Sequence, residues 1–133
     1  MRNICLLMCV IMICGAAQAA DLSGLPKIAG VSGGIAVVVG DIDAKTLSGL
    51  RTGGHFVVHG LTGDQNRVDR IRAELKQQGI YGKVTVDLWD EKNLPFVENF
   101  ANLIVAEKPL GISPAEIQRA LCPLGAYCVK GDD

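Results

Sequence analysis

The stretch Ile35–Ala44 constrains the fold more than any other part of this chain of 133 residues. It begins with an apolar run of mostly β-branched residues and continues with the turn Gly40-Asp41-Ile42-Asp43. A strand that is buried on both faces has such an unbroken apolar run, which is typical of the centre of a parallel sheet. In α/β proteins, the tight turn that follows such a strand commonly binds a nucleotide or nucleoside cofactor.

The composition predicts one globular domain. Hydrophobic residues make up 49% of the chain and charged residues 20%, which excludes a disordered segment of this length. The length allows one core and not two. The formal net charge of -1 gives no support for a surface that binds nucleic acid or an anionic membrane.

The N-terminus has the pattern of a secretory signal peptide. Arg2 precedes an apolar block over Ile4–Cys14, and the small residues Ala17-Gln18-Ala19 follow. The block is shorter than the roughly 20 residues that a membrane-spanning helix needs. We therefore expect a signal peptide over 1–19 and export to the periplasm or the extracellular space, with no stable membrane anchor after cleavage. Residues 20–34 are predicted to be an irregular lead-in, and 35–133 the folded domain.

Strand and helix patterns alternate along the domain. Apolar runs predict strands at 35–39, 55–61, 83–88, 102–106 and 126–130, and helical patterns occupy 44–51, 65–78 and 114–121. Predicted N-caps are Asp43, Asp64 and Ser113, the last opening a capping box with Glu116. The link over 91–100 has no clear helical pattern. This order predicts a parallel, doubly wound α/β sheet with right-handed crossovers.

Four segments, in this order, resemble the motifs of class I S-adenosylmethionine-dependent methyltransferases. The turn Gly40–Asp43 lies where the family has its glycine-rich motif, and His59–Asp64 lies at the end of the second strand. Asp90–Phe96 is similar to the family's Asp-x-x-x-Leu-Pro-Phe segment, and Leu121–Gly125 to its Leu-x-Pro-Gly-Gly turn. The resemblance extends over most of the predicted domain.

The resemblance implies a Rossmann-like parallel sheet of about five strands flanked by helices, without the last two strands of the family fold. It implies S-adenosylmethionine as the cofactor, bound at the carboxyl ends of the strands. The residues that it places nearest the cofactor are Gly40, Asp41, Thr62, Asp90 and Glu91. It assigns no catalytic residue and no metal ligand.

The sequence departs from the family pattern at three positions. Ile42 and Ala44 stand where the family has its second and third glycines, and Thr62 stands at the acidic position that ends the second strand. We expect the branched side chain of Ile42 to occupy space that the cofactor fills in the family. The carboxylates of Asp41 and Asp43 either face the amino group of the cofactor or cap the following helix.

Two classes of function follow from these observations. The first is an exported S-adenosylmethionine-dependent methyltransferase-like domain with a degenerate cofactor site. The second is a non-catalytic exported interaction or scaffold module that keeps the sheet without the cofactor. The chain also resembles the start of exported bacterial proteins in which a methyltransferase-like segment precedes a β-propeller of pyrroloquinoline-quinone-type repeats. That resemblance implies a protein partner or a further C-terminal region.

Two further side chains have alternative interpretations. Glu107, after the fourth strand, is either a general base at the carboxyl end of the sheet or a solvated loop carboxylate. Trp89, at the end of the third strand, either stacks on an adenine ring or packs in the core.

The histidines and the C-terminal cysteines allow fewer conclusions. His55 and His59 are four residues apart on a predicted strand and therefore about 13 Å apart, too far to hold one metal ion. Cys122 and Cys128 either form a disulfide in an oxidising compartment or remain thiols on the two sides of a turn.

Overall fold

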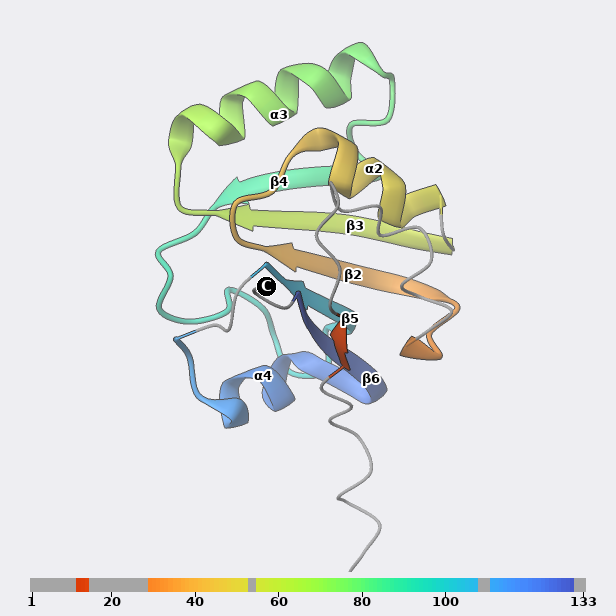
Figure 1. Cartoon of the computed structure of the whole chain (residues 1–133), viewed down its shortest axis with the longest axis vertical. Coiled ribbons are helices and arrows are strands. Elements are labelled where there is room, and N and C mark those ends of the chain that lie inside the picture. The colour runs from red at the N-terminus through yellow and green to blue at the C-terminus, as the bar shows by residue number, and fades with distance from the viewer. Residues whose placement is uncertain (1–11, 15–28, 53–54, 108–110, 131–133) are drawn as a thin grey trace, which may run out of the picture.

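The computed structural model of the chain describes residues 12–14, 29–52, 55–107 and 111–130. Within these residues, parallel strands form a six-stranded sheet in the order β1-β6-β5-β2-β3-β4, and helices flank it (Figure 1). The strands are β1 (Met12–Cys14), β2 (Gly33–Val39), β3 (His55–Thr62), β4 (Val84–Leu88), β5 (Ala101–Ala106) and β6 (Leu121–Lys130). The helices are α2 (Ala44–Thr52), α3 (Gln65–Gln77) and α4 (Pro114–Ala120). The predicted α/β class and the five predicted strands are confirmed.

The direction of strand progression reverses between β2 and β5. The chain steps outward from β2 to β3 and β4 through α2 and α3, and then returns to β5 on the other side of β2. Val39, the last residue of β2, pairs with Leu61 of β3 and with Ala106 of β5. Open α/β sheets bind their ligands beyond the carboxyl ends of the strands at such a reversal.

One face of the sheet is covered by α2 and α3, and we call it the α2/α3 face (Figure 1). Alternate side chains of the strands point to it, including Ala36 and Val38 of β2. Leu47 of α2 is fully buried there. From α3 the buried residues are Val68, Ile71 and Leu75, which repeat at helical spacing and so lie on one side of the helix.

The opposite face, which we call the α4 face, is covered by α4 and by the link between β4 and β5. Val37 and Val39 of β2 point to it and pack with Ile117 of α4. The link contributes Trp89 and Leu94 to the same cluster. No helix forms between residues 89 and 100, so the prediction that the chain crosses the sheet there without a clear helix is confirmed.

Local capping chemistry sets the helix boundaries. The Asp64 carboxylate accepts a hydrogen bond from the Asn66 N–H at 2.9 Å, and the Ser113 hydroxyl accepts one from the Glu116 N–H at 3.2 Å. The Glu116 carboxylate forms an ion pair with Arg119 at 2.6 Å. Gly79 follows α3 with φ +73°, the left-handed conformation expected of a C′ glycine. The glycines at 53 and 54, which follow the helical pattern over 44–51 in the sequence and predict its end, lie outside the described residues.

The structure differs from the prediction at β1 and at the start of β6. A sixth strand, β1, lies within the segment predicted to be a signal peptide, and it pairs with β6 from Met12↔Cys128 to Cys14↔Lys130. Through this pairing, the apolar segment β1 forms backbone hydrogen bonds with the edge of β6, which would otherwise be open. β6 starts at Leu121, before the predicted turn, because its pairing with β5 continues through a bulge. Leu124 in this bulge has φ 65°, and the register of the pairing shifts on β5 between Ala101 and Leu103.

No helix in the described part of the chain is both long and apolar enough to cross a membrane.

Candidate functional site

Three backbone hydrogen bonds hold the loops at the carboxyl ends of the strands together. The Gly40 N–H donates to the Leu61 carbonyl at 3.0 Å, and the Glu107 N–H donates to the Val39 carbonyl at 3.1 Å. The Trp89 N–H donates to the Thr62 carbonyl at 2.9 Å. The loops after β2, β3, β4 and β5 therefore meet at one edge, which we call the carboxyl edge. It comprises residues 40–43, 62–64, 89–92 and 107, and so includes every residue that the family motifs place near a cofactor.

Both the backbone conformation at position 40 and the close approach of Glu107, the residue after β5, require a glycine there. Its φ of +128° lies in a region that residues with a Cβ rarely adopt. A Cβ built there would lie 2.8 Å from Glu107 Cβ, so glycine lets the half-buried Glu107 come close to the turn. The structure thus places Glu107 at the carboxyl edge, next to the first motif residue.

The expectation for Ile42 is wrong. Its side chain is fully buried in the core of the α2/α3 face and does not point outward from the carboxyl edge. Gly60 on β3 makes the room, since a Cβ at that position would lie 2.5 Å from Ile42 Cδ1. The Ile42 carbonyl accepts a hydrogen bond from Arg67 Nη1 of α3 at 3.2 Å, which fixes the turn from the other side.

The two aspartates of the turn have different roles. The Asp43 carboxylate accepts a hydrogen bond from the Thr46 N–H at 2.7 Å and caps α2. Burial raises the pKa of Asp43, but the hydrogen bonds from Thr46 and the charges of Lys45 and Arg67 together lower it below its ordinary value. Both aspartates are exposed, and the capping interpretation holds for Asp43, whose carboxylate is bound to the Thr46 N–H.

At the end of β3, a carboxylate comes from the neighbouring loop. Thr62 occupies the acidic position of the motif and is 1% exposed. The next residue, Gly63, leaves space in which a Cβ would lie 2.8 Å from Oε1 of Glu91. Glu91 reaches this place from a backbone with φ 61°. Glu91, a predicted site residue, thus brings a carboxylate next to Gly63, the residue that follows Thr62 at the end of β3.

Asp90 and Trp89 follow β4 and point in different directions. Asp90 is exposed, and its carboxylate accepts a hydrogen bond from the Lys92 N–H at 3.0 Å. Trp89 is 8% exposed, packs in the core of the α4 face and donates its indole N–H to the Asn93 carbonyl at 2.6 Å. The core-packing interpretation of Trp89 is therefore confirmed.

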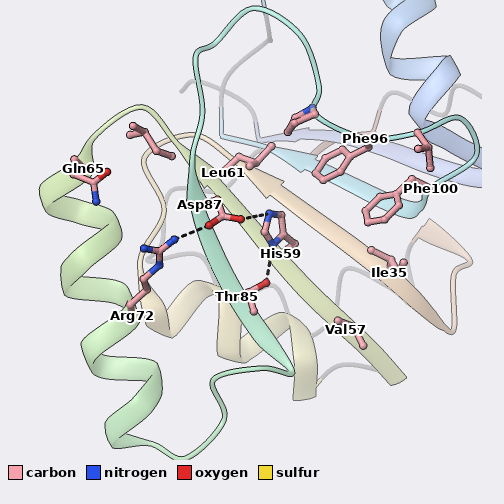
Figure 2. A pocket seen from close by; sticks show the side chains of 13 residues that line it. Ile35, Val57, His59, Leu61, Gln65, Arg72, Thr85, Asp87, Phe96 and Phe100 are labelled. Atoms are coloured by element: carbon pink, nitrogen blue, oxygen red, sulfur yellow. Dashed lines mark hydrogen bonds and ion pairs between the residues drawn. The ribbon is translucent and has the colours of Figure 1, made fainter.

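A separate cleft of about 770 Å³ opens on the α4 face, over β3 and the edge strand β4 (Figure 2). The link over 95–100 forms one wall, and side chains of α3 reach its rim around β4. The lining side chains are those of Ile35, Val57, His59, Leu61, Gln65, Arg72, Thr85, Asp87, Leu88, Pro95, Phe96, Val97 and Phe100. Most of them are apolar.

A connected polar cluster lies in this cleft (Figure 2). His59 Nδ1 is hydrogen-bonded to Thr85 Oγ1 at 2.6 Å, and His59 Nε2 lies 3.4 Å from Asp87 Oδ2. Arg72 pairs with Asp87 Oδ1 at 2.6 Å. Burial lowers the pKa of His59, Asp87 raises it and Arg72 lowers it, and the net result is a pKa below the ordinary 6.5. His59 therefore remains neutral at neutral pH.

The sequence motifs did not identify this cluster, although one signal was available. Thr85 and Asp87 are two residues apart on a strand and therefore share a face. Their partner His59 is brought opposite Thr85 only by the register of β3 against β4. That register is a tertiary property.

The two histidines and the cysteines Cys122 and Cys128 do not belong to the carboxyl edge. His55 is exposed at the start of β3, whereas His59 is engaged in the polar cluster. Among the described residues, no three potential metal ligands come together. No disulfide joins Cys122 and Cys128; the Cys122 thiol donates to the Asn99 carbonyl at 2.8 Å, and Cys128 is buried.

No protein-family model matches the sequence, and no curated protein matches it. Solved structures of methyltransferases are nevertheless similar in backbone. A protein from Methanococcus maripaludis, assigned as an S-adenosyl-L-methionine-dependent methyltransferase, has a TM-score of 0.67 at 20% identity over 80% of this chain and 52% of its own. Geranyl diphosphate methyltransferase in complex with SAM has a TM-score of 0.63 at 17% identity over 71% and 40%.

A third similar structure is a protein assigned as a methyltransferase and solved in complex with a methyltransferase activator from Haloferax volcanii. Its TM-score is 0.61 at 21% identity, over 81% of this chain and 51% of its own. The chain thus spans about half, or less, of each of these three structures. It has the class I methyltransferase-like Rossmann fold that the motifs predict.

Proposed function

We propose that this chain is an exported domain that binds S-adenosylmethionine at the carboxyl edge. One observation carries the proposal: backbone hydrogen bonds bring the loops with Gly40, Thr62 and Asp90 to one edge, next to the reversal of strand order. The fold likeness to methyltransferases supports the same ligand.

The residues at this edge fit the chemistry of the cofactor. S-adenosylmethionine supplies, when bound, a methyl group on a positively charged sulfonium. Asp41, Asp90 and Glu91 are exposed carboxylates, which accept hydrogen bonds and favour positive charge. Ile42 leaves the edge open because its side chain is in the core.

In this proposal, Glu91 supplies the carboxylate that the family has at the end of the second strand, where this chain has Thr62. Its carboxylate lies beside the end of β3, above Gly63, where it can accept hydrogen bonds from ligand hydroxyl groups. A Cβ at position 63 would lie 2.8 Å from Oε1 of Glu91, so a side chain there would require this exposed carboxylate to move.

The test is a calorimetric titration of the chain with S-adenosylmethionine and S-adenosylhomocysteine. We expect binding that Asp90→Ala abolishes and that Glu91→Gln weakens about tenfold, the effect of losing one hydrogen bond to a charged group.

Glu74→Ala is the matched control, since Glu74 is an exposed carboxylate on the solvent side of α3. It should bind as the unmodified chain does. Binding that survives Asp90→Ala, or affinity that is unaffected by Glu91→Gln, would contradict the assignment of these residues.

A second candidate is a non-catalytic interaction module. It is supported by Ile42 and Ala44, which replace two family glycines and are both buried in the core. In this form of the proposal, the turn after β2 has become a packing element, and the domain binds a protein partner or a quinoprotein-like C-terminal region. A folded chain that gives no heat with either S-adenosyl compound would favour this candidate over the first.

Export is proposed from the N-terminal sequence alone. The test is the intact mass of the protein after expression in a secreting bacterial host. Cleavage after Ala19 should remove β1 and leave a chain that starts at Ala20. A cytoplasmic product that retains Met1–Ala19 would contradict export.

A further inference from the structure

The cleft on the α4 face is a candidate binding site that the proposed function does not use. Its volume of about 770 Å³ falls in the range of small-molecule sites, roughly 300–1,000 Å³. None of Gly40, Asp41, Thr62, Asp90 and Glu91 lines it. Its lining instead extends along β3 and β4, from Leu61 back to Val57.

Exposed apolar side chains are concentrated in this cleft. Among the described residues, the large hydrophobic side chains exposed to solvent are Val57, Tyr81, Leu88, Val97 and Leu124. Three of them line the cleft, with exposed fractions of 50% for Val57, 52% for Leu88 and 71% for Val97. A gathering of this kind beside polar groups is typical of a ligand site, whereas isolated exposed apolar residues are common on any surface.

One wall of the cleft is aromatic. The rings of Phe96 and Phe100 are stacked at 4.5 Å with an interplanar angle of 4°, and Phe96 meets His59 edge-on at 5.9 Å (Figure 2). Both phenylalanines are half-buried, so part of each ring remains accessible. Such a wall favours a flat ligand that can stack against or meet these rings.

The polar side chains of the cleft carry no net charge at neutral pH. Arg72 and Asp87 neutralise each other, and burial keeps His59 neutral by lowering its pKa. The Asp87 side chain is 56% exposed, so its carboxylate can accept a further hydrogen bond from the cleft side. A charged ligand would lose hydration in this cleft without gaining a counter-charge of its own.

We propose that this cleft binds an uncharged, flat aromatic molecule that carries a hydrogen-bond donor. The aromatic part lies against Phe96 and over Val57, and the donor faces the carboxylate of Asp87. Arg72 donates a hydrogen bond to one oxygen of that carboxylate, and His59 Nε2 lies 3.4 Å from the other, so the acceptor is positioned before the ligand arrives.

The experiment uses two fluorescent probes that share one aromatic skeleton. N-phenyl-1-naphthylamine is neutral and has one N–H donor, and 1-anilinonaphthalene-8-sulfonate adds a negative charge. We expect fluorescence enhancement with the neutral probe and at least about tenfold weaker binding of the sulfonate. Equal affinity for the two probes, or no enhancement with the neutral one, would overturn the proposal.

Location is tested by placing a charge in the cleft. Val97→Lys changes a loop side chain that is mostly exposed, and Val57→Lys changes the cleft floor. Both should weaken the neutral probe about tenfold or more, whereas Leu124→Lys, at an exposed apolar position outside the cleft, should not. Equal losses in all three variants would show non-specific binding.

Competition separates this site from the proposed cofactor site. Saturating S-adenosylmethionine should leave the probe signal unchanged, because the carboxyl edge and the cleft have different linings. Displacement of the probe would overturn the inference of a separate site. An apolar peptide that displaces the probe while no small aromatic competes would also overturn it, by assigning the cleft to a protein partner.

Discussion

The two faces of the sheet are built from the same strands but closed to different degrees. On the α2/α3 face, helices lie over β2, β3 and β4, and side chains such as Leu47 and Val58 are fully buried. On the α4 face, the helix lies against β6, and Val57 of the same strand as Val58 is 50% exposed. The helices of the crossovers from β2 to β3 and from β3 to β4 cover the α2/α3 face, whereas the crossover from β4 to β5 has no helix and leaves a cleft on the α4 face.

The comparison predicts a large difference between core truncations on the two faces. Leu47→Ala should lower the free energy of unfolding by about 2–5 kcal/mol, because it leaves a cavity in a fully closed core. Val57→Ala should change it by about 0.5 kcal/mol or less, since that side chain is half exposed. Urea unfolding followed by circular dichroism measures both. Similar losses for the two variants would contradict the difference in closure.

Hydrogen bonds from Arg119 connect α4 to the link between β4 and β5. Arg119 donates to the Phe96 carbonyl at 2.7 Å and to the Leu94 carbonyl at 3.2 Å. Arg119→Met should therefore loosen the wall of the cleft and raise hydrogen exchange in 94–100 by about tenfold, while α3 keeps its protection. Arg70→Met, at an exposed position on α3, is the control. Unchanged exchange in the link would mean that packing alone holds this wall.

The smallest expected effect is a pH dependence that originates on the α4 face. The pKa of His59 is below 6.5 in the folded chain, so the unfolded chain binds more protons as the pH falls. The contribution of His59 to stability is complete above about pH 6.5 and is lost as the pH falls toward its folded pKa.

Thermal unfolding from pH 7.5 to pH 5 measures this effect. His59→Gln should flatten the profile over this range, and His55→Gln, at the exposed start of β3, should not. A profile that is equally steep after His59→Gln would assign the pH dependence to other groups.

The sequence predicts what depends on local pattern. Apolar runs such as Val37–Val39 identify the strands, and the caps Asp64 and Ser113 identify helix starts. The placement of Gly40 and Asp90 at one edge of the sheet follows from parallel strands, whose carboxyl ends share an edge.

Features that depend on tertiary neighbours escape such patterns. The side chain of Ile42 enters the core because Gly60, eighteen positions on, leaves room for it. The polar cluster requires the register that puts His59 opposite Thr85. The β1 strand depends on its pairing with β6, the last strand in the described part of the chain.

Hydrogen–deuterium exchange with and without S-adenosylmethionine reports where on the chain the ligand binds. We expect added protection at 40–43, 62–64 and 89–92, with no change over the cleft segments 57–59 and 95–100. Protection over the cleft segments in place of the carboxyl edge, or no protection in a folded chain, would contradict this prediction.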